Sequence, residues 1–384
     1  MQPEPTSAPA PSVPTYWDYL QIDTLLGLQG GLAGDESGLS ADELLFIIVH
    51  QSYELWFKQV LRELKEATAL LGGQRLDEEK VPAVVHQLRR AAQIMRLAVE
   101  QFHVMETLTP QDFLSFRDKL VPASGFQSFQ IRELELRLGL TSAQRERYGE
   151  TDALAHIKGL ADRSPAGARA WAHISAAQAD ADAGLTLRAV VEDWLARTPI
   201  EGSTPGHPAD SAVVDHFIDG YLAALDDWHG EQLRRLQAAQ LTTAAELEAR
   251  FAAASAAAAR FLRADDAPDA ERPHRKRARA GLLFIESHRD LPLLAWPRLL
   301  IDTVVELEEQ LVLFRHRHAR MVERVIGRRV GTGGSSGVEY LDRTTHARVF
   351  ADLWGVRTLL MPKDRVPALA DAGFYAFSAP PPRG

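Results

Sequence analysis

The sequence predicts an all-α fold, a helical bundle around one buried core. Apolar residues recur at spacings of three and four along almost every patterned stretch, and no stretch shows the alternation typical of a half-buried strand. The chain has 384 residues, of which 46% are hydrophobic and 25% are charged. It is therefore long enough to bury a large core and too apolar to be disordered as a whole.

We expect a single ordered domain over residues 15–378. Residues 1–14 contain five prolines among small polar residues and predict a disordered arm, and residues 379–384 predict a disordered Pro-rich tail. Two segments within the domain resemble insertions: residues 199–211, which are rich in Pro, Gly and Ser, and residues 243–280, which begin with an Ala-rich amphipathic stretch.

The composition excludes several kinds of protein. Lys and Arg number 43 against 52 Asp and Glu, a net charge of −9, which disfavours non-specific binding to nucleic acid or to an anionic membrane. The absence of cysteine excludes disulfides, Cys-ligated zinc, iron–sulfur clusters, a Cys nucleophile and a thiolate-bound haem. No long apolar run and no secretion signal is present, so we expect a cytoplasmic protein.

The first long helix begins at a capping box, in which Ser40 is followed by Glu43, and it runs through Leu64 without Gly or Pro. One face of this helix is rich in aromatic residues, and His50 lies on that face one turn after Phe46. The other members of the face are Tyr53, Phe57 and Leu64. Aromatic residues at this spacing are more often core than cofactor-binding residues.

A short helix follows, capped by Thr109 and ended by Pro122, and it carries Arg117 in an apolar stretch. A buried guanidinium needs an anionic partner. Asp112 or Asp118 could provide an internal salt bridge, which we slightly prefer, and the other hypothesis is a ligand carboxylate held bidentately.

A basic run occupies residues 272–279. It could be a nucleic-acid patch, but no aromatic residue interrupts it, so a solvated helix face is the better interpretation.

The second long helix is expected over residues 298–326, ending at Gly327. His318 occupies one position of its apolar face, whereas His316 lies off that face and should contact solvent. The apolar positions are Leu300, Val304, Leu307, Leu311, Phe314, Met321 and Val325. A lone histidine here is more often a hydrogen-bonded core residue than a ligand, but a second one, His50, makes a paired site an even alternative.

The glycine-rich segment 331–337 comes soon after His318. It is either a flexible linker or a loop that closes over a ligand, with Thr332 as a polar contact. It is not a phosphate-binding loop, because no Gly-Lys-Ser/Thr follows.

At these positions the sequence resembles the tryptophan 2,3-dioxygenase family, which consists of all-helical haem enzymes. The resemblance covers about residues 16–367. Its matching blocks are YWDYLQID (16–23), DELLFIIVHQSYELWFKQ (42–59), FRD (116–118), PASGFQS (122–128), HARMV (318–322) and GTGGSSG (331–337).

The resemblance implies an enzyme that encloses haem b, ferrous in its active form, and inserts O2 across the indole C2=C3 bond of L-tryptophan to give N-formyl-L-kynurenine. It also implies a homotetramer, a dimer of dimers. His318 matches the axial ligand of the haem iron, and His50 matches the histidine that contacts the indole N–H. Phe46 matches a ring that packs on the indole, while Arg117 and Thr332 match the residues near the substrate carboxylate and ammonium.

Further positions match less directly. Ser124 corresponds to a residue of the substrate pocket, and Tyr16 and Tyr19 correspond to residues that reach the pocket of a neighbouring subunit. Arg132 and Tyr340 correspond to positions near the haem propionates.

One position departs from the family, since Phe314 stands where a Trp is usual, which removes an indole donor one turn before His318. Two other functions remain open. They are an oxygenase for substituted tryptophans or other indoles in the same superfamily, and a non-catalytic haem sensor.

Overall fold

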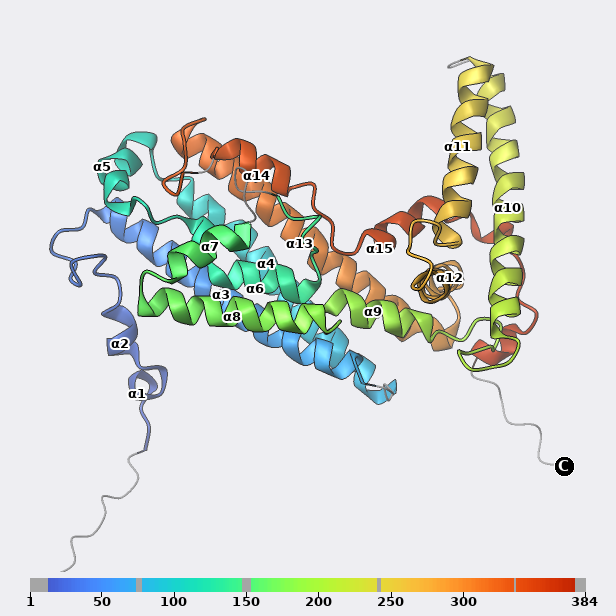
Figure 1. The fold of residues 1–384 in the computed structure, drawn as a ribbon, viewed down its shortest axis with the longest axis horizontal. Coiled ribbons are helices and arrows are strands. Elements are labelled where there is room, and N and C mark those ends of the chain that lie inside the picture. Colours follow the sequence, from blue (N-terminus) through green and yellow to red (C-terminus); the bar gives the residue numbers. More distant parts are fainter. Residues whose placement is uncertain (1–12, 74–77, 147–152, 240–242, 335, 377–384) are drawn as a thin grey trace, which may run out of the picture.

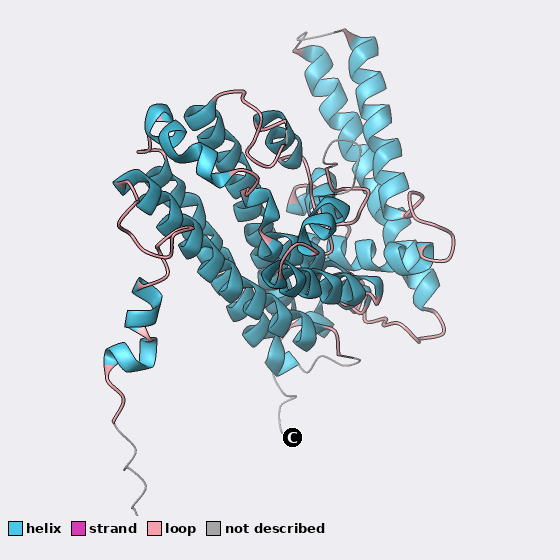
Figure 2. Ribbon diagram, turned by 60° about the vertical axis from the view of Figure 1, so that its left-hand side comes forward, coloured by secondary structure: helices cyan, strands magenta, loops and turns pink. Residues whose placement is uncertain are grey.

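The computed structural model describes residues 13–73, 78–146, 153–239, 243–334 and 336–376. Within these ranges the regular structure is helical and Figure 2 shows no strand. The only β-type pairing there is an isolated bridge between Ile200 and Ser203. The all-α prediction is confirmed. The expected disordered residues 1–12 and 379–384 lie outside the described ranges.

The helices follow one another along the chain. The first half contains α1 (Tyr16–Leu20), α2 (Ile22–Leu26), α3 (Ala41–Leu71), α4 (Val81–Met105), α5 (Pro110–Leu120), α6 (Phe129–Leu138), α7 (Ala153–Ala161) and α8 (Pro165–Asp182). The second half contains α9 (Leu187–Ala196), α10 (Asp210–Ala238), α11 (Ala244–Leu262), α12 (Arg272–Ser287), α13 (Ala295–Ile326), α14 (Val338–Thr344) and α15 (Ala351–Gly355). Short 3-10 turns lie between them.

Both long helices start or end beyond their expected limits. The side chain of Ser40 accepts from the amide of Glu43 as predicted, but α3 continues past Leu64 to Leu71 because no helix breaker precedes Gly72. Helix α13 begins three residues earlier than expected, at Ala295, since a proline is tolerated in the first turn of a helix.

The core is centred on α4, which packs against both α3 and α13. Its apolar face, with Leu88, Met95 and Phe102, is buried between them. The predicted apolar positions of α13 are buried as well, apart from Phe314, which is partly buried. Burial of these faces removes apolar surface of the long helices from water and stabilises the bundle.

Further helices surround this centre (Figure 1). Helix α6 packs on α3 and α8, α9 packs on α12 and α3, and α14 packs on α13. The Ala-rich stretch after residue 243 forms α11, which pairs with α10 as a helical hairpin that projects from the rest of the molecule (Figure 1).

The solvated-face interpretation of the basic run is wrong for two of its arginines. Arg277 and Arg279 are buried on α12. Arg277 donates to the carboxylate of Asp210 at 3.0 Å, and Arg279 donates to Asp352 at 2.8 Å and to Asp266 at 2.8 Å. These two arginines are buried because carboxylates from other segments of the chain pair with them. The sequence of the basic run itself does not indicate those partners.

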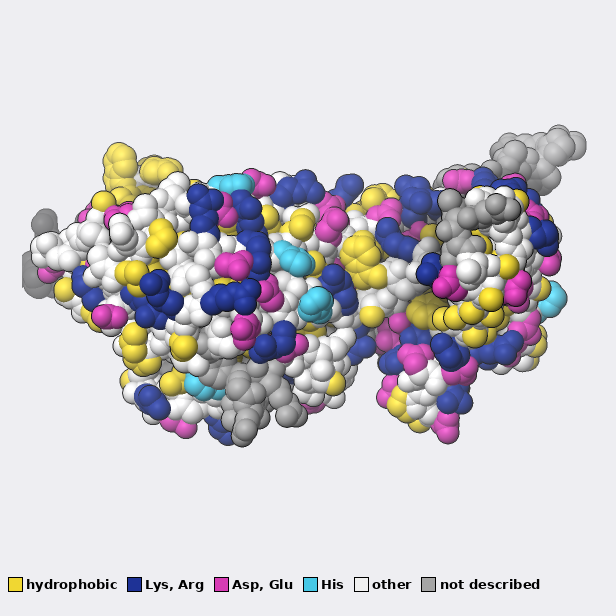
Figure 3. Space-filling view, turned by 90° about the horizontal axis from the view of Figure 1, so that it is seen from above, with side chains coloured by type: hydrophobic (Ala, Val, Ile, Leu, Met, Phe, Trp, Pro, Cys, Tyr) yellow, Lys and Arg dark blue, Asp and Glu magenta, His cyan; other side chains and the backbone are white. Residues whose placement is uncertain are grey.

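The surface mixes charges of both signs. In the face shown in Figure 3, Lys and Arg side chains lie beside Asp and Glu side chains rather than forming one basic field. Among the described residues, none of the helices combines the length and the apolar composition that crossing a bilayer requires.

Candidate active site

Most of the residues singled out in the sequence line one cavity of about 260 Å³. It is lined by residues of α3, α4, α5, α6, α13, α14 and the glycine-rich segment. The site residues on its wall are Phe46, His50, Arg117, Ser124, Arg132, Phe314, His318, Thr332 and Tyr340. Segments more than 250 residues apart in the chain therefore meet at one place, as His50 and His318 illustrate.

His318 lies on the cavity wall, where its ring stacks on Phe102 with 5.8 Å between the ring centroids. Burial, together with the nearby His50 and Arg132, lowers the pKa of His318 to about 4. Neither of its ring nitrogens has a hydrogen-bond partner among the residues that the structure describes, so it is not a core histidine bonded to a carbonyl. A neutral imidazole with a free lone pair is a ligand for a transition metal.

His50 differs from His318 because one of its nitrogens is held. Its Nδ1 lies 2.8 Å from the carbonyl oxygen of Phe46. A carbonyl only accepts, so Nδ1 carries the proton and Nε2 is left as an acceptor in the neutral ring. Burial lowers the pKa of His50, against the opposing effects of that hydrogen bond and of Glu54, and so favours this neutral form.

Aromatic rings surround the two histidines. Phe46 packs on His50 with 4.0 Å between centroids and contacts Phe116 at 5.6 Å. Phe314 packs against Tyr53 at 5.8 Å and Phe102 at 5.1 Å. These contacts fix the ring positions, and the cavity can therefore accept a flat apolar group without rearranging its wall.

Arg117 forms no salt bridge with Asp112 or Asp118, and the internal-pair hypothesis is therefore wrong in this structure. Its guanidinium donates to the carbonyl of Val330 at 2.6 Å, and its Nε is buried without a hydrogen-bond partner. The hydroxyl of Thr332 donates to the carbonyl of Ala123 at 2.7 Å. These two contacts hold the start of the glycine-rich segment against the cavity. A flexible linker would not need such contacts.

A second group of polar residues lies around α6. Arg132 donates to Glu135 at 2.7 Å, hydrogen bonds to Tyr340 and lies over the ring of Phe126. Burial disfavours its charged form, but Glu135 and Tyr340 outweigh burial and raise the pKa of Arg132. Ser124 caps the following 3-10 turn by accepting from the amide of Phe126 at 3.3 Å.

The sequence pattern did not reveal two residues of this wall, Arg315 and Phe102. Arg315 pairs with Glu135 at 3.2 Å, and both residues line the cavity. Arg315 lies three residues before His318, and residues three apart are neighbours on a helix surface. The sequence could therefore have indicated that Arg315 lies near His318. Phe102 also contributes to the wall, but its location in α4 depends on helix packing and had no local signal.

Tyr16 and Tyr19 do not reach this cavity. They lie on α1, which stands away from the bundle (Figure 1), and their exposed fractions are 69% and 80%. His316 is exposed, as expected.

The fold and the cavity together define an all-helical protein with a partly enclosed site for a flat apolar group, lined by neutral imidazoles and by a guanidinium available to an anion. Comparisons with known proteins identify the family. The family model for tryptophan 2,3-dioxygenase matches residues 7–360. The chain therefore belongs to the tryptophan 2,3-dioxygenase family.

Individual relatives agree with the family match. Tryptophan 2,3-dioxygenase of Sorangium cellulosum is 45% identical over 371 residues, covering 94% of this chain and 87% of the relative. Tryptophan 2,3-dioxygenase 2 of Ralstonia nicotianae is 45% identical over 373 residues, covering 95% and 98%. A tryptophan 2,3-dioxygenase-like protein of Xanthomonas campestris is 46% identical over 277 residues, covering 70% of this chain and 98% of the relative.

Proposed function

We propose that this protein is a haem-dependent dioxygenase that inserts both atoms of O2 across the indole C2=C3 bond of L-tryptophan, giving N-formyl-L-kynurenine. One observation carries the proposal beyond family membership: His318, His50 and Arg117, from three different helices, line the same cavity. A haem sensor would need His318 to hold the iron, but it would not need Arg117.

The wall of the cavity fits a haem. His318 would hold the iron through an unprotonated ring nitrogen, and Phe102, Phe314 and Met321 would provide apolar surface for the macrocycle. Arg132 has a buried Nε without a hydrogen-bond partner, on the side where Tyr340 also lies, which suits a carboxylate of the cofactor. When bound, ferrous haem b supplies the binding and activation of O2.

The chain orients the substrate. We assign the carboxylate of tryptophan to Arg117, whose Nε has no other partner, and the ammonium to the neighbourhood of Thr332. The indole N–H then donates to Nε2 of His50, which is the free acceptor of that ring, while Phe46 packs on the indole face. This arrangement presents one edge of the indole to the reacting oxygen and excludes water from it.

We further propose a cytoplasmic homotetramer in which α1 contributes to the cavity of a neighbouring subunit. The exposed aromatic side chains of Tyr16, Trp17 and Tyr19 support this assignment, since such a group on one short helix gains stability when a partner covers it. Light scattering that gave a fully active monomer would contradict it.

An absorbance assay tests the activity. The dithionite-reduced protein should show a Soret band, and addition of L-tryptophan in air with ascorbate should produce N-formylkynurenine absorbance. A Soret band without product, for tryptophan and for 5- and 6-substituted tryptophans, would rule out the dioxygenase. A colourless protein that takes up no haem would exclude the cofactor.

A further inference from the structure

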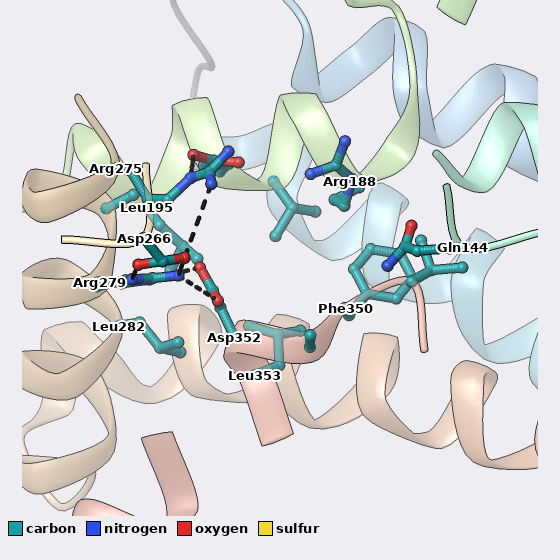
Figure 4. Close-up of a pocket in the computed structure, with 15 residues that line it drawn as sticks. Gln144, Arg188, Leu195, Asp266, Arg275, Arg279, Leu282, Phe350, Asp352 and Leu353 are labelled. Atoms are coloured by element: carbon teal, nitrogen blue, oxygen red, sulfur yellow. Dashed lines mark hydrogen bonds and ion pairs between the residues drawn. The ribbon is translucent and has the colours of Figure 1, made fainter. Parts of the chain in front are cut away.

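A second cavity, of about 220 Å³, lies between α9, α12 and the segment that leads into α15 (Figure 4). It shares no lining residue with the cavity of His50 and His318. Its apolar lining includes Val191 and Leu195 from α9, Leu282 from α12 and Phe350 before α15. Because these side chains belong to the buried core, the cavity wall is rigid.

Arg188 is the cation available in this cavity. Its Nε donates to the carbonyl of Gly139 at 3.2 Å, and its two terminal nitrogens have no partner among the described residues. Gly139 adopts φ 105°, and a Cβ there would lie 2.9 Å from Cβ of Arg188. The glycine thus permits the close approach that holds the guanidinium in place before any ligand arrives.

The charged groups on the opposite side of the cavity are already paired, as Figure 4 shows. Arg279 donates to Asp266 and Asp352, each at 2.8 Å. Arg275 lies 3.3 Å from Glu192. Glu192 lies on α9, one turn after Arg188, so the side opposite Arg188 holds Asp266 and Asp352 together with the guanidiniums that neutralise them. That side therefore offers no unpaired cation to a second anionic group.

We propose that this cavity binds a small monocarboxylate with an apolar or aromatic body. The carboxylate receives two parallel hydrogen bonds from the terminal nitrogens of Arg188. The body packs on Val191, Leu195 and Phe350. Because Arg275 and Arg279 are already paired, a second carboxylate would find no free cation among them, which disfavours dicarboxylates.

Equilibrium dialysis of radiolabelled 3-phenylpropionate against the holoenzyme tests the site. We expect Arg188→Met to weaken binding by about tenfold to a hundredfold, the effect of losing a charge-assisted hydrogen bond. Arg169→Met removes an exposed arginine of α8 and should leave binding unchanged. Arg117→Met distinguishes binding in the two cavities. It changes only the cavity of His50 and His318, so it should leave the Arg188-dependent binding intact.

Two probes test the site without any substitution, should Arg188→Met not fold. The neutral 3-phenylpropionamide should bind at least tenfold more weakly than the acid, by the same argument about the charge-assisted contact, and succinate should not compete. The proposal is overturned if Arg188→Met binds like the wild type, if the amide binds as tightly as the acid, if succinate competes, or if Arg117→Met abolishes all binding.

Discussion

The guanidinium of Arg117 donates a hydrogen bond of 2.6 Å to the carbonyl oxygen of Val330. Helix α5 is thereby joined to the start of the glycine-rich segment at the cavity that we assign to tryptophan. A substrate carboxylate would reach the same guanidinium, so substrate binding and the position of this segment are coupled.

Arg117→Met should raise KM for L-tryptophan by about tenfold to a hundredfold, because a charge-assisted contact to the carboxylate is lost. Haem content should not change. Steady-state kinetics and the Soret absorbance measure both quantities. Ser115→Ala, on the exposed side of the same helix, is the matched control. Equal KM values for Arg117→Met and the wild type would remove Arg117 from the substrate site.

His318→Ala should lose most of its haem, because the imidazole that would hold the iron is removed. His316→Ala changes an exposed histidine two positions away on α13 and should keep the full Soret band. Haem per subunit, measured after gel filtration, compares the two variants. Full haem content in His318→Ala would show that another residue holds the iron.

The pH dependence of kcat/KM should follow the protonation of His50. Burial lowers its pKa below the usual 6.5, so the ring is neutral above that pH and its Nε2 accepts the indole N–H. We expect kcat/KM to be flat above pH 6.5 and to fall only at lower pH. His50→Ala should keep its haem, lower kcat/KM by roughly threefold to tenfold, and lack this acidic limb. An unchanged limb in the variant would assign it to another group.

The buried arginines of α12 should contribute to stability more than their exposed neighbour. Arg279→Met leaves Asp266 and Asp352 without their shared cation. Because both carboxylates are partly exposed, we expect a loss of about 1.5 to 3 kcal/mol in the free energy of unfolding, the effect of losing a charge-assisted hydrogen bond. Arg272→Met breaks an exposed pair with Asp269 and should cost at most about 1 kcal/mol. Urea unfolding with both variants tests this difference, and similar losses would contradict the burial of Arg279.

Acid stability should depend on His288, at the C-terminal end of α12. Burial, and secondarily Lys363, lower its pKa to about 4 from 6.5. Between these values the unfolded chain binds a proton that the folded chain does not, so stability is complete above pH 6.5 and declines as the pH falls toward 4. His288→Asn should flatten this decline, whereas His216→Asn, at an exposed position of α10, should not. Urea midpoints across this pH range provide the measurement.

Local signals in the sequence were sufficient for the helices and for much of the candidate site. Caps such as Ser40 and breaks such as Gly327 act within a few residues, and helical periodicity alone placed His50 and His318 on buried faces. The motifs around these histidines indicated the family, and with it the residues that the structure brings to one cavity.

Tertiary structure decided which partner each charged group finds. Arg117 bonds to Val330 rather than to Asp112, Arg315 pairs with Glu135, and Arg279 is buried between carboxylates. These outcomes depend on which helices pack together, and residues far apart in the chain carry no local sign of that. The cavity at Arg188 exists for the same reason, because α9, α12 and the start of α15 form it only after the chain has folded.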